Sequence, residues 1–220
     1  MKNLNDSFKW NRLEGVKITS DYDMPVVAPV NNVHPRNFVS FNNAKYCKDK
    51  GNSWYHFYIH DAYFERIWKN PDKYLQMLSQ FEGGVSTDFS LYLDMPWAQQ
   101  IYNSWRNKYM AVLLQRQGKP VIPNVGWSDA ASYDWAFSGI PENSILSITT
   151  QGCLRNRICK QSLFNGLHEL VRRKHPSAIV VYGVFHDEWK DKFGTEFDYF
   201  TAIAPPIHSY QHHRYAIEHQ

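Results

Sequence analysis

Residues 85–125, VSTDFSLYLDMPWAQQIYNSWRNKYMAVLLQRQGKPVIPNV, decide the fold because a strand pattern, a long helix pattern and a second strand pattern follow one another there. The helix pattern is a stripe of apolar residues at steps of three and four: Trp97, Ile101, Trp105, Tyr109 and Val112 or Leu113. This spacing places one apolar face on an α-helix, and Gly118 is a suitable stop. Two strands joined by a helix favour a parallel pair, because parallel strands need a long crossover connection.

The same alternation extends outward from this stretch in both directions. Further strands are expected at 26–30, 38–41, 54–60, 145–149, 178–182 and 197–203. Further helices are expected at 62–70, 71–81, 128–137 and 157–174, with Asp61 and Asp94 as N-terminal caps and Gly83-Gly84 as a helix stop. The pattern predicts an α/β protein of repeated strand–helix units with a mainly parallel sheet. Two arrangements stay open: a small irregular (β/α) barrel, favoured because the helices come one per strand, and an open three-layer α/β sandwich.

The composition is that of a chain that folds. Of the 220 residues, 43% are hydrophobic and 20% are charged. Aromatic residues make up 16%, enough to fill the core and also to form a stacking surface for bases. We expect one α/β domain over 1–220, with its core at 24–203, an N-terminal extension at 1–23 and a polar, His-rich tail at 204–220. The net charge of +3 permits a nucleic-acid partner without requiring one.

Cysteine usage and hydropathy indicate a cytoplasmic protein with no membrane partner. Cys47, Cys153 and Cys159 are odd in number and widely spaced, so buried free thiols are expected in place of a disulfide framework. The N-terminus lacks the apolar core of a signal peptide. No apolar run reaches the roughly 18 residues of a membrane-spanning helix. The oligomeric state stays open.

Polar residues follow several predicted strands at their carboxyl ends. Ligands of parallel α/β folds bind at this edge of the sheet, so we expect these residues to line one pocket. The pocket candidates are His60, Asp61, Asp88, Asn124, Trp127, Asp129, Thr149, Thr150, Gln151, Gly152, Tyr182 and Gly183.

Asp61 and Asp88 are the candidate catalytic residues within this set. Two carboxylates can bind a divalent cation or share acid–base work. The alternative is that Asp61 is an N-cap and that Asp88 caps or ties down the DFS turn, as Asp often does. Further metal-ligating types nearby are Asp129, Asp187, His56, His60 and His186. Their spacing matches no zinc motif, so the cofactor stays unknown, with a divalent cation as the one candidate.

The segment 149–152, TTQG, can present backbone amides and hydroxyls to a phosphate at the start of the following helix. Arg155, Arg157 and Lys160 come directly after it and are candidates for contacts with phosphate or nucleic acid. The alternative is a solvated basic helix face, because Lys and Arg usually lie on the surface. No P-loop or dinucleotide-binding glycine motif occurs.

Residues 85–153 also carry a family resemblance. The DFS…DMP and VIPNVxW segments, with IVVYG at 179–183, resemble DUF4417, an uncharacterised family common in bacteria, phages and other mobile elements. The resemblance covers roughly residues 24–185 and includes Gly166-Leu167 and Arg172-Arg173. The chain departs from the pattern at Gly126-Trp127, where members often have a basic residue before the Trp, and in its TTQGC turn. The resemblance implies an association with phages or mobile elements and no established chemistry.

Three functions stay open. The first is binding of single-stranded nucleic acid, or help in its replication or processing, through the strand-end pocket and the adjacent basic residues. The second is an interaction protein that blocks a host factor such as a defence system, which would need an exposed apolar or aromatic patch. The third is a hydrolase acting on a phosphate ester or nucleotide with Asp61 and Asp88.

Overall fold

The computed structural model describes residues 9–184, 193 and 198–200, and it forms two parallel β-sheets. The first sheet has the strand order β1 (Phe38–Ser40), β2 (Trp54–His56), β3 (Gly83–Val85) and β4 (Val121–Ile122). The second has the order β5 (Ile145–Thr149), β6 (Ala178–Tyr182) and β7 (Asp198–Phe200). The pairs within both sheets are parallel, which confirms the α/β class and the mainly parallel sheet.

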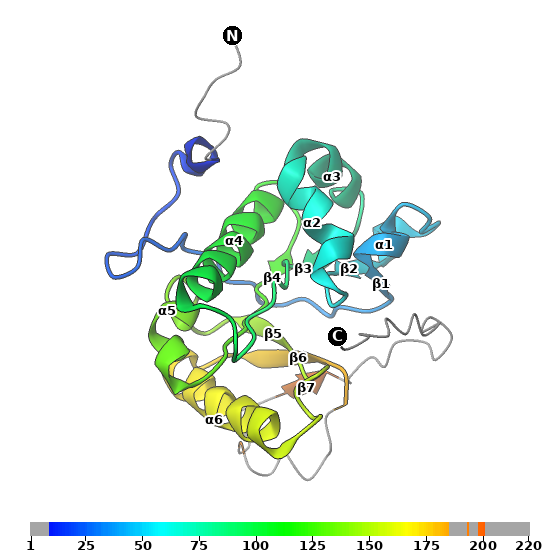
Figure 1. Cartoon of the computed structure of the whole chain (residues 1–220). Coiled ribbons are helices and arrows are strands. Elements are labelled where there is room, and N and C mark those ends of the chain that lie inside the picture. Colours follow the sequence, from blue (N-terminus) through cyan, green and yellow to red (C-terminus); the bar gives the residue numbers. More distant parts are fainter. Residues whose placement is uncertain (1–8, 185–192, 194–197, 201–220) are drawn as a thin grey trace, which may run out of the picture.

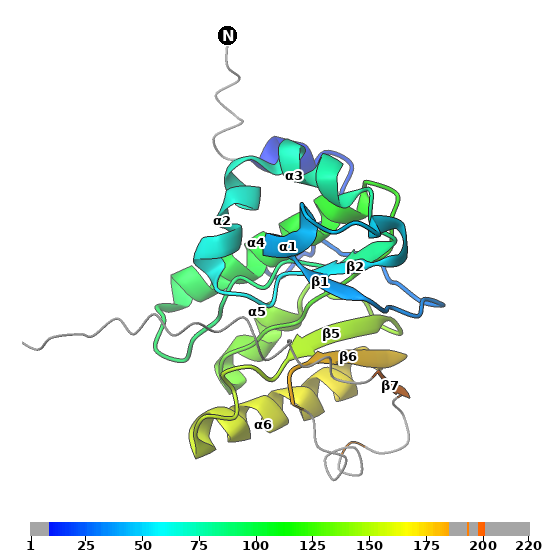
Figure 2. The ribbon, with the colours of Figure 1, turned by 90° about the vertical axis from the view of Figure 1, so that its right-hand side faces the viewer.

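The helices lie on the outer sides of the two sheets (Figures 1 and 2). They are α1 (Phe41–Ala44), α2 (Asp61–Lys69), α3 (Pro71–Leu78), α4 (Trp97–Gln115), α5 (Tyr133–Phe137) and α6 (Arg157–Lys174), with short 3-10 turns η2 (Trp10–Leu13), η3 (Lys50–Asn52) and η4 (Ala130–Ser132). In Figure 2, α1 to α4 lie above the first sheet and α6 lies below the second. Each helix row buries apolar side chains of the sheet beneath it, such as Tyr55 under the first row and Leu146 under the second.

The inner faces of the two sheets enclose a third apolar cluster. Alternate residues of the strands point into it: Trp54, Val85, Ile122, Ile145, Ala178, Val180 and Tyr182. Their neighbours in the sequence point outward toward the helices, as the period of two along a strand requires. The expected burial of 178–182 on both faces is confirmed, since all five residues of β6 are buried.

The favoured closed barrel is not formed. Over the described residues, β1 pairs only with β2, β7 pairs only with β6, and one bridge, Asn124 to Ser147, joins the two sheets. On the side of β3, pairing ends after Ile122 because Asn124 N donates to Ser86 Oγ and not to the main chain. On the side of β5, Pro123 accepts from Ser147 N but has no N–H to donate, so the contact between the sheets stays a single bridge. The strands therefore run in sequence order through a curved, interrupted sheet.

Several expected boundaries were wrong at the level of single residues. Gly83 and Gly84 form part of β3 and do not stop a helix. A Cβ on Gly84 would lie 2.1 Å from the ring of Tyr55, so the glycines leave room for neighbouring rings. His60 caps α2 in place of Asp61, and α4 begins after Pro96 without a side-chain cap from Asp94. Segment 26–30 forms no strand.

Candidate functional site

A chain of hydrogen bonds joins residues that follow β2, β3 and β4 to the middle of β5. Asn124, just after β4, donates through Nδ2 to the Asp88 carboxylate beyond β3 at 2.8 Å. The Asn124 Oδ1 atom accepts from the Tyr58 hydroxyl beyond β2 at 3.0 Å, and that hydroxyl lies 2.5 Å from Ser147 Oγ on β5. Ser147 in turn donates to the carbonyl of Val180 on β6. We call Tyr58, Asp88, Asn124 and Ser147 the strand-end network.

Aromatic rings pack against the network from the second sheet. Tyr182 stacks on Tyr58 with 4.9 Å between ring centroids and lies 4.7 Å from the ring of His56. Burial lowers the pKa of His56 to about 4, so this imidazole is neutral at physiological pH. Asn124 and Tyr182, which were expected at one edge of the sheet, both contact Tyr58. Asp88, expected at the same edge, contacts Asn124.

Asp88 is the carboxylate of the network, and its pKa is shifted. Burial raises its pKa to about 7; the hydrogen bond from Asn124 opposes this shift, and the nearby charge of Asp61 adds to it. The charge of Asp88 in turn contributes, after burial, to the raised pKa of Cys153, about 11. Asp61 and Cys153 therefore both lie close enough to Asp88 to interact with it electrostatically.

Asp61 ties the loop after β3 to the start of α2. Its carboxylate accepts hydrogen bonds from Ser90 N at 3.0 Å and from Ser90 Oγ at 2.8 Å. This contact differs from the N-cap role considered for Asp61, which His60 takes instead, and it holds the loop that carries Asp88. The two carboxylates are thus neighbours with different surroundings.

Three main-chain amides at the start of the loop after β5 are hydrogen-bonded within the protein. Thr150 N donates to the carbonyl of Tyr182, Gln151 N donates to Thr149 Oγ1, and Cys153 N donates to the carbonyl of Thr150. These three amides are therefore directed into the protein and not toward a phosphate at the rim. A Cβ on Gly183 would lie 2.5 Å from Thr150 Oγ1, so a glycine is required where the β5 and β6 ends meet.

Three other predicted pocket residues have local structural roles. His60 caps α2 through Nδ1, which accepts from Ala62 N. Asp129 caps η4 by accepting from Ala131 N. Trp127 packs on α6, with Nε1 donating to the carbonyl of Ser162. None of these contacts involves the strand-end network.

The polar face that α4 buries was missed by reasoning from the sequence. Gln100, Asn103 and Asn107 are buried on this helix, and each holds a main-chain group of the loop that follows β3. Asn107 accepts from Phe89 N and donates to Phe89 O, which fixes the position next to Asp88. The signal was present as a run of amides at helical spacing, but the apolar stripe on the same helix masked it.

Exposed rings and cations occur in the segments that follow β2, β3 and β5. The exposed rings are Tyr63, Tyr92 and Trp97, and the exposed cations are Arg155, Arg157 and Lys160. Ser128 links α4 to α6. Its hydroxyl donates to Gln100 of α4, and its carbonyl accepts from Ser162 of α6. The starts of α4 and α6 lie at the same end as the arrowheads of β5 and β6 in Figure 2.

Metal ligands do not gather in the part of the chain that the structure describes: no group of three or more His, Cys, Asp or Glu side chains is close enough to hold an ion. His186, Asp187 and most of the 197–203 strand candidate lie outside the described residues. Cys47, Cys153 and Cys159 are free thiols, half-buried in each case. Among the described helices, none is long and apolar enough to cross a membrane.

The fold and site define an α/β protein with parallel sheets and a polar network at their carboxyl edge. The model of DUF4417, a domain of unknown function, matches residues 16–201, and the chain belongs to this family. It is 32% identical to the Gene 1 protein of Mycobacterium phage D29 over 75% of the chain and 62% of that protein. It is 30% identical to the Gene 1 protein of Mycobacterium phage L5 over 75% of the chain and 72% of that protein. No solved structure matches the chain.

Proposed function

We propose that this protein binds single-stranded nucleic acid across the rim of the strand-end network, in the cytoplasm of a phage-infected host cell. The observation that carries the proposal is that exposed rings lie at and just before the start of α4, exposed cations lie at the start of α6, and both helix starts lie at the same end of the molecule (Figure 2). Flat rings stack on unpaired bases of any sequence, and cations follow the phosphate backbone. The phage-encoded relatives fit this setting.

Contacts beside the network hold the loop after β3 in place. Asp61 fixes the loop after β3 through Ser90, and the amides of α4 fix the same loop from the other side. Tyr92 and Trp97 follow in this loop and at the start of α4, so both rings are carried on anchored backbone. Anchored rings lose little freedom on stacking, which favours binding.

Salt-dependent binding tests the proposal. We expect fluorescence anisotropy of a labelled single-stranded DNA to show binding that weakens steeply between low and moderate salt, because each phosphate contact releases counterions. Replacing Arg155, Arg157 and Lys160 with Gln should flatten the salt dependence, and Trp97→Ala should cost about 1–3 kcal/mol of binding free energy. The matched control is Gln99→Ala, an exposed change two residues further along α4. Absence of binding at low salt contradicts the proposal.

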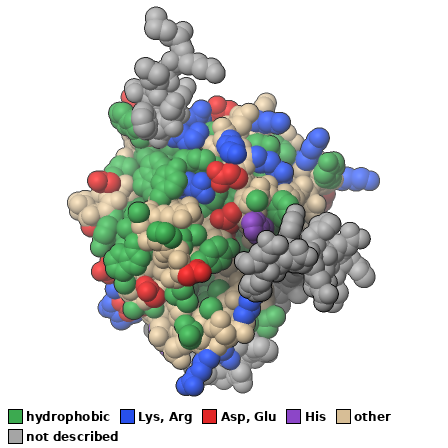
Figure 3. Space-filling model, in the orientation of Figure 1, with side chains coloured by type: hydrophobic (Ala, Val, Ile, Leu, Met, Phe, Trp, Pro, Cys, Tyr) green, Lys and Arg blue, Asp and Glu red, His purple; other side chains and the backbone are tan. Residues whose placement is uncertain are grey.

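A second candidate is an interaction with a host protein. Exposed apolar side chains on the N-terminal segment and α4 favour it: Trp10, Ile18 and Tyr102. A cavity of about 590 Å³ opens among neighbouring residues, including Leu13 and Trp105. Figure 3 shows hydrophobic side chains over this region of the surface. Stoichiometric recovery of one host protein, lost in Tyr102→Asp and kept in Trp97→Ala, would favour this function.

A further inference from the structure

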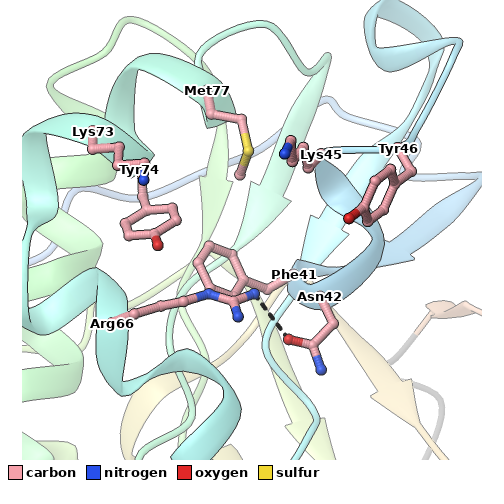
Figure 4. Close-up of a pocket in the computed structure, with 8 residues that line it drawn as sticks. All are labelled: Phe41, Asn42, Lys45, Tyr46, Arg66, Lys73, Tyr74 and Met77. Carbon is pink, nitrogen blue, oxygen red and sulfur yellow. Dashed lines mark hydrogen bonds between the residues drawn. The ribbon is translucent and has the colours of Figure 1, made fainter.

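A second pocket lies between α1, α2 and α3, away from the strand ends (Figure 4). It has a volume of about 410 Å³, which lies within the range of small-molecule sites. Its lining combines three cations and three aromatic rings with one amide and one thioether: Lys45, Arg66, Lys73, Phe41, Tyr46, Tyr74, Asn42 and Met77. Among the described residues, no carboxylate belongs to this lining.

The carboxylates on the same helices are paired elsewhere. Glu65 of α2 accepts from Arg106 at 3.2 Å, and Asp72 of α3 accepts from Arg12. Arg66 and Lys73, their sequence neighbours, form no ion pair with a described carboxylate. The pocket therefore keeps its positive charge. Figure 3 shows Lys and Arg side chains gathered over the part of this face where Figure 1 places α2 and α3.

The guanidinium of Arg66 is held in position inside the pocket. It donates to Asn42 Oδ1 at 3.0 Å, and it lies 4.8 Å from the ring centroid of Phe41 and 5.8 Å from that of Tyr74. A guanidinium oriented in this way can present its remaining N–H groups to a phosphate as a fork. Lys45 and Lys73 approach from the two other helices that form the pocket, as Figure 4 shows.

An aromatic ring is available beside these cations. Tyr46, which closely follows α1, is 75% exposed and lines the same pocket. A base can stack on an exposed tyrosine ring while its phosphate meets Arg66. Cations alone would suit any anion, but cations beside an exposed ring select an anion that is itself aromatic.

We propose that the pocket between α1, α2 and α3 binds a nucleotide, with the phosphate at Arg66, Lys45 and Lys73 and the base against Tyr46. The nucleotide can be free or can be the 5′-phosphorylated end of a nucleic-acid strand, since both present the same two groups. The site shares no residue with the strand-end rim, so it stands independently of the function proposed above.

Calorimetric titration of the full chain with adenosine 5′-monophosphate tests this site. We expect tighter binding of the monophosphate than of adenosine or inorganic phosphate, because only the nucleotide uses both the cations and the ring. Arg66→Gln should weaken binding about tenfold, in line with the loss of a charged hydrogen bond. Lys69→Gln removes an exposed cation from the same helix outside the lining and should leave affinity unchanged.

A competition experiment distinguishes the two sources of the ligand. The competitors are an oligothymidylate with a 5′-phosphate and the same oligothymidylate without it. If only the phosphorylated strand displaces the monophosphate, the pocket binds strand ends. If neither strand competes, the pocket binds free nucleotides. The protein with Arg155, Arg157 and Lys160 replaced by Gln should bind the monophosphate normally. Equal affinity of the Arg66→Gln and Lys69→Gln proteins, or binding of neither the monophosphate nor the phosphorylated strand, overturns the proposal.

Discussion

At the residue scale, burial of Asp88 makes the stability of the protein depend on pH. Its pKa rises from 3.8 to about 7 on folding, so the folded protein keeps a proton that the unfolded chain releases. The free energy of unfolding contributed by this group therefore falls as pH rises through this window and is level above it.

Asp88→Asn should remove this loss, because Asn keeps an oxygen that can accept from Asn124 without carrying a charge. We expect the free energy of unfolding of the variant to exceed that of the wild type by about 1–2 kcal/mol at pH 8 and by little near pH 4. The value at pH 8 is reduced because the Asp88 side chain is partly exposed. Urea unfolding across pH measures it. Asp94→Asn, an exposed change in the same loop, is the control. A difference between Asp88→Asn and wild type that is constant with pH contradicts this account.

Gly166 of α6 is required by the ring of Trp127. A Cβ at this position would lie 1.9 Å from Trp127 Nε1, so Gly166→Ala should destabilise the protein by about 1–3 kcal/mol through overpacking. The usual effect of Gly→Ala within a helix has the opposite sign. Thermal unfolding of Gly166→Ala, Trp127→Leu and the variant carrying both changes measures the coupling. The alanine should cost less when it is combined with Trp127→Leu, whereas strictly additive costs would argue against a direct clash.

Part of the strand-end network could be predicted from single residues, and part could not. Asp88 and Asn124 of the network, and Tyr182 packed beside it, follow or end apolar runs, so strand direction alone placed them at one edge of the sheet. Tyr58 and Ser147 were missed as members of the network because they lie within apolar patterns, where a hydroxyl is read as a tolerated core residue. Only the approach of the two sheets brings those hydroxyls to within 2.5 Å of each other.

At the element scale, α4 serves as a clamp for the loop after β3. Asn107 satisfies both main-chain groups of Phe89, at 2.8 and 3.0 Å, in a buried setting. Asn107→Ala leaves these groups without partners and should lower the free energy of unfolding by about 2–4 kcal/mol. Chemical denaturation checks the value, with Gln99→Ala on the exposed face of α4 expected near wild type. Equal stabilities of the two variants would rule out the clamp.

The positions of the long elements were predictable, whereas their ends were not. The α4 stripe and the apolar runs of β5 and β6 carry strong periodic signals. The predicted N-cap at Asp61 was wrong because its carboxylate binds Ser90 instead. The predicted helix stop at Gly83-Gly84 was wrong because this glycine pair lies in a strand, where it leaves room for rings that are distant in the sequence.

At the scale of the whole molecule, the parallel strands run in sequence order without closing. The number of strand–helix units suggested a barrel, but closure depends on strand length and pairing across the last gap. Pro123 has no N–H to donate toward β5, and a single bridge, Asn124 to Ser147, joins the two sheets. The apolar cluster between the sheets then replaces the missing ladder as the contact between the two halves.

The position of a bound strand is the central claim that remains to be measured. Photo-crosslinking of the wild-type protein to single-stranded DNA containing 5-bromodeoxyuridine, followed by mass spectrometry of the crosslinked peptides, tests it most directly. We predict crosslinks at Tyr92 and Trp97, on the rim of the strand-end network. Crosslinks confined to peptides remote from this rim, with none at either ring, would contradict the account.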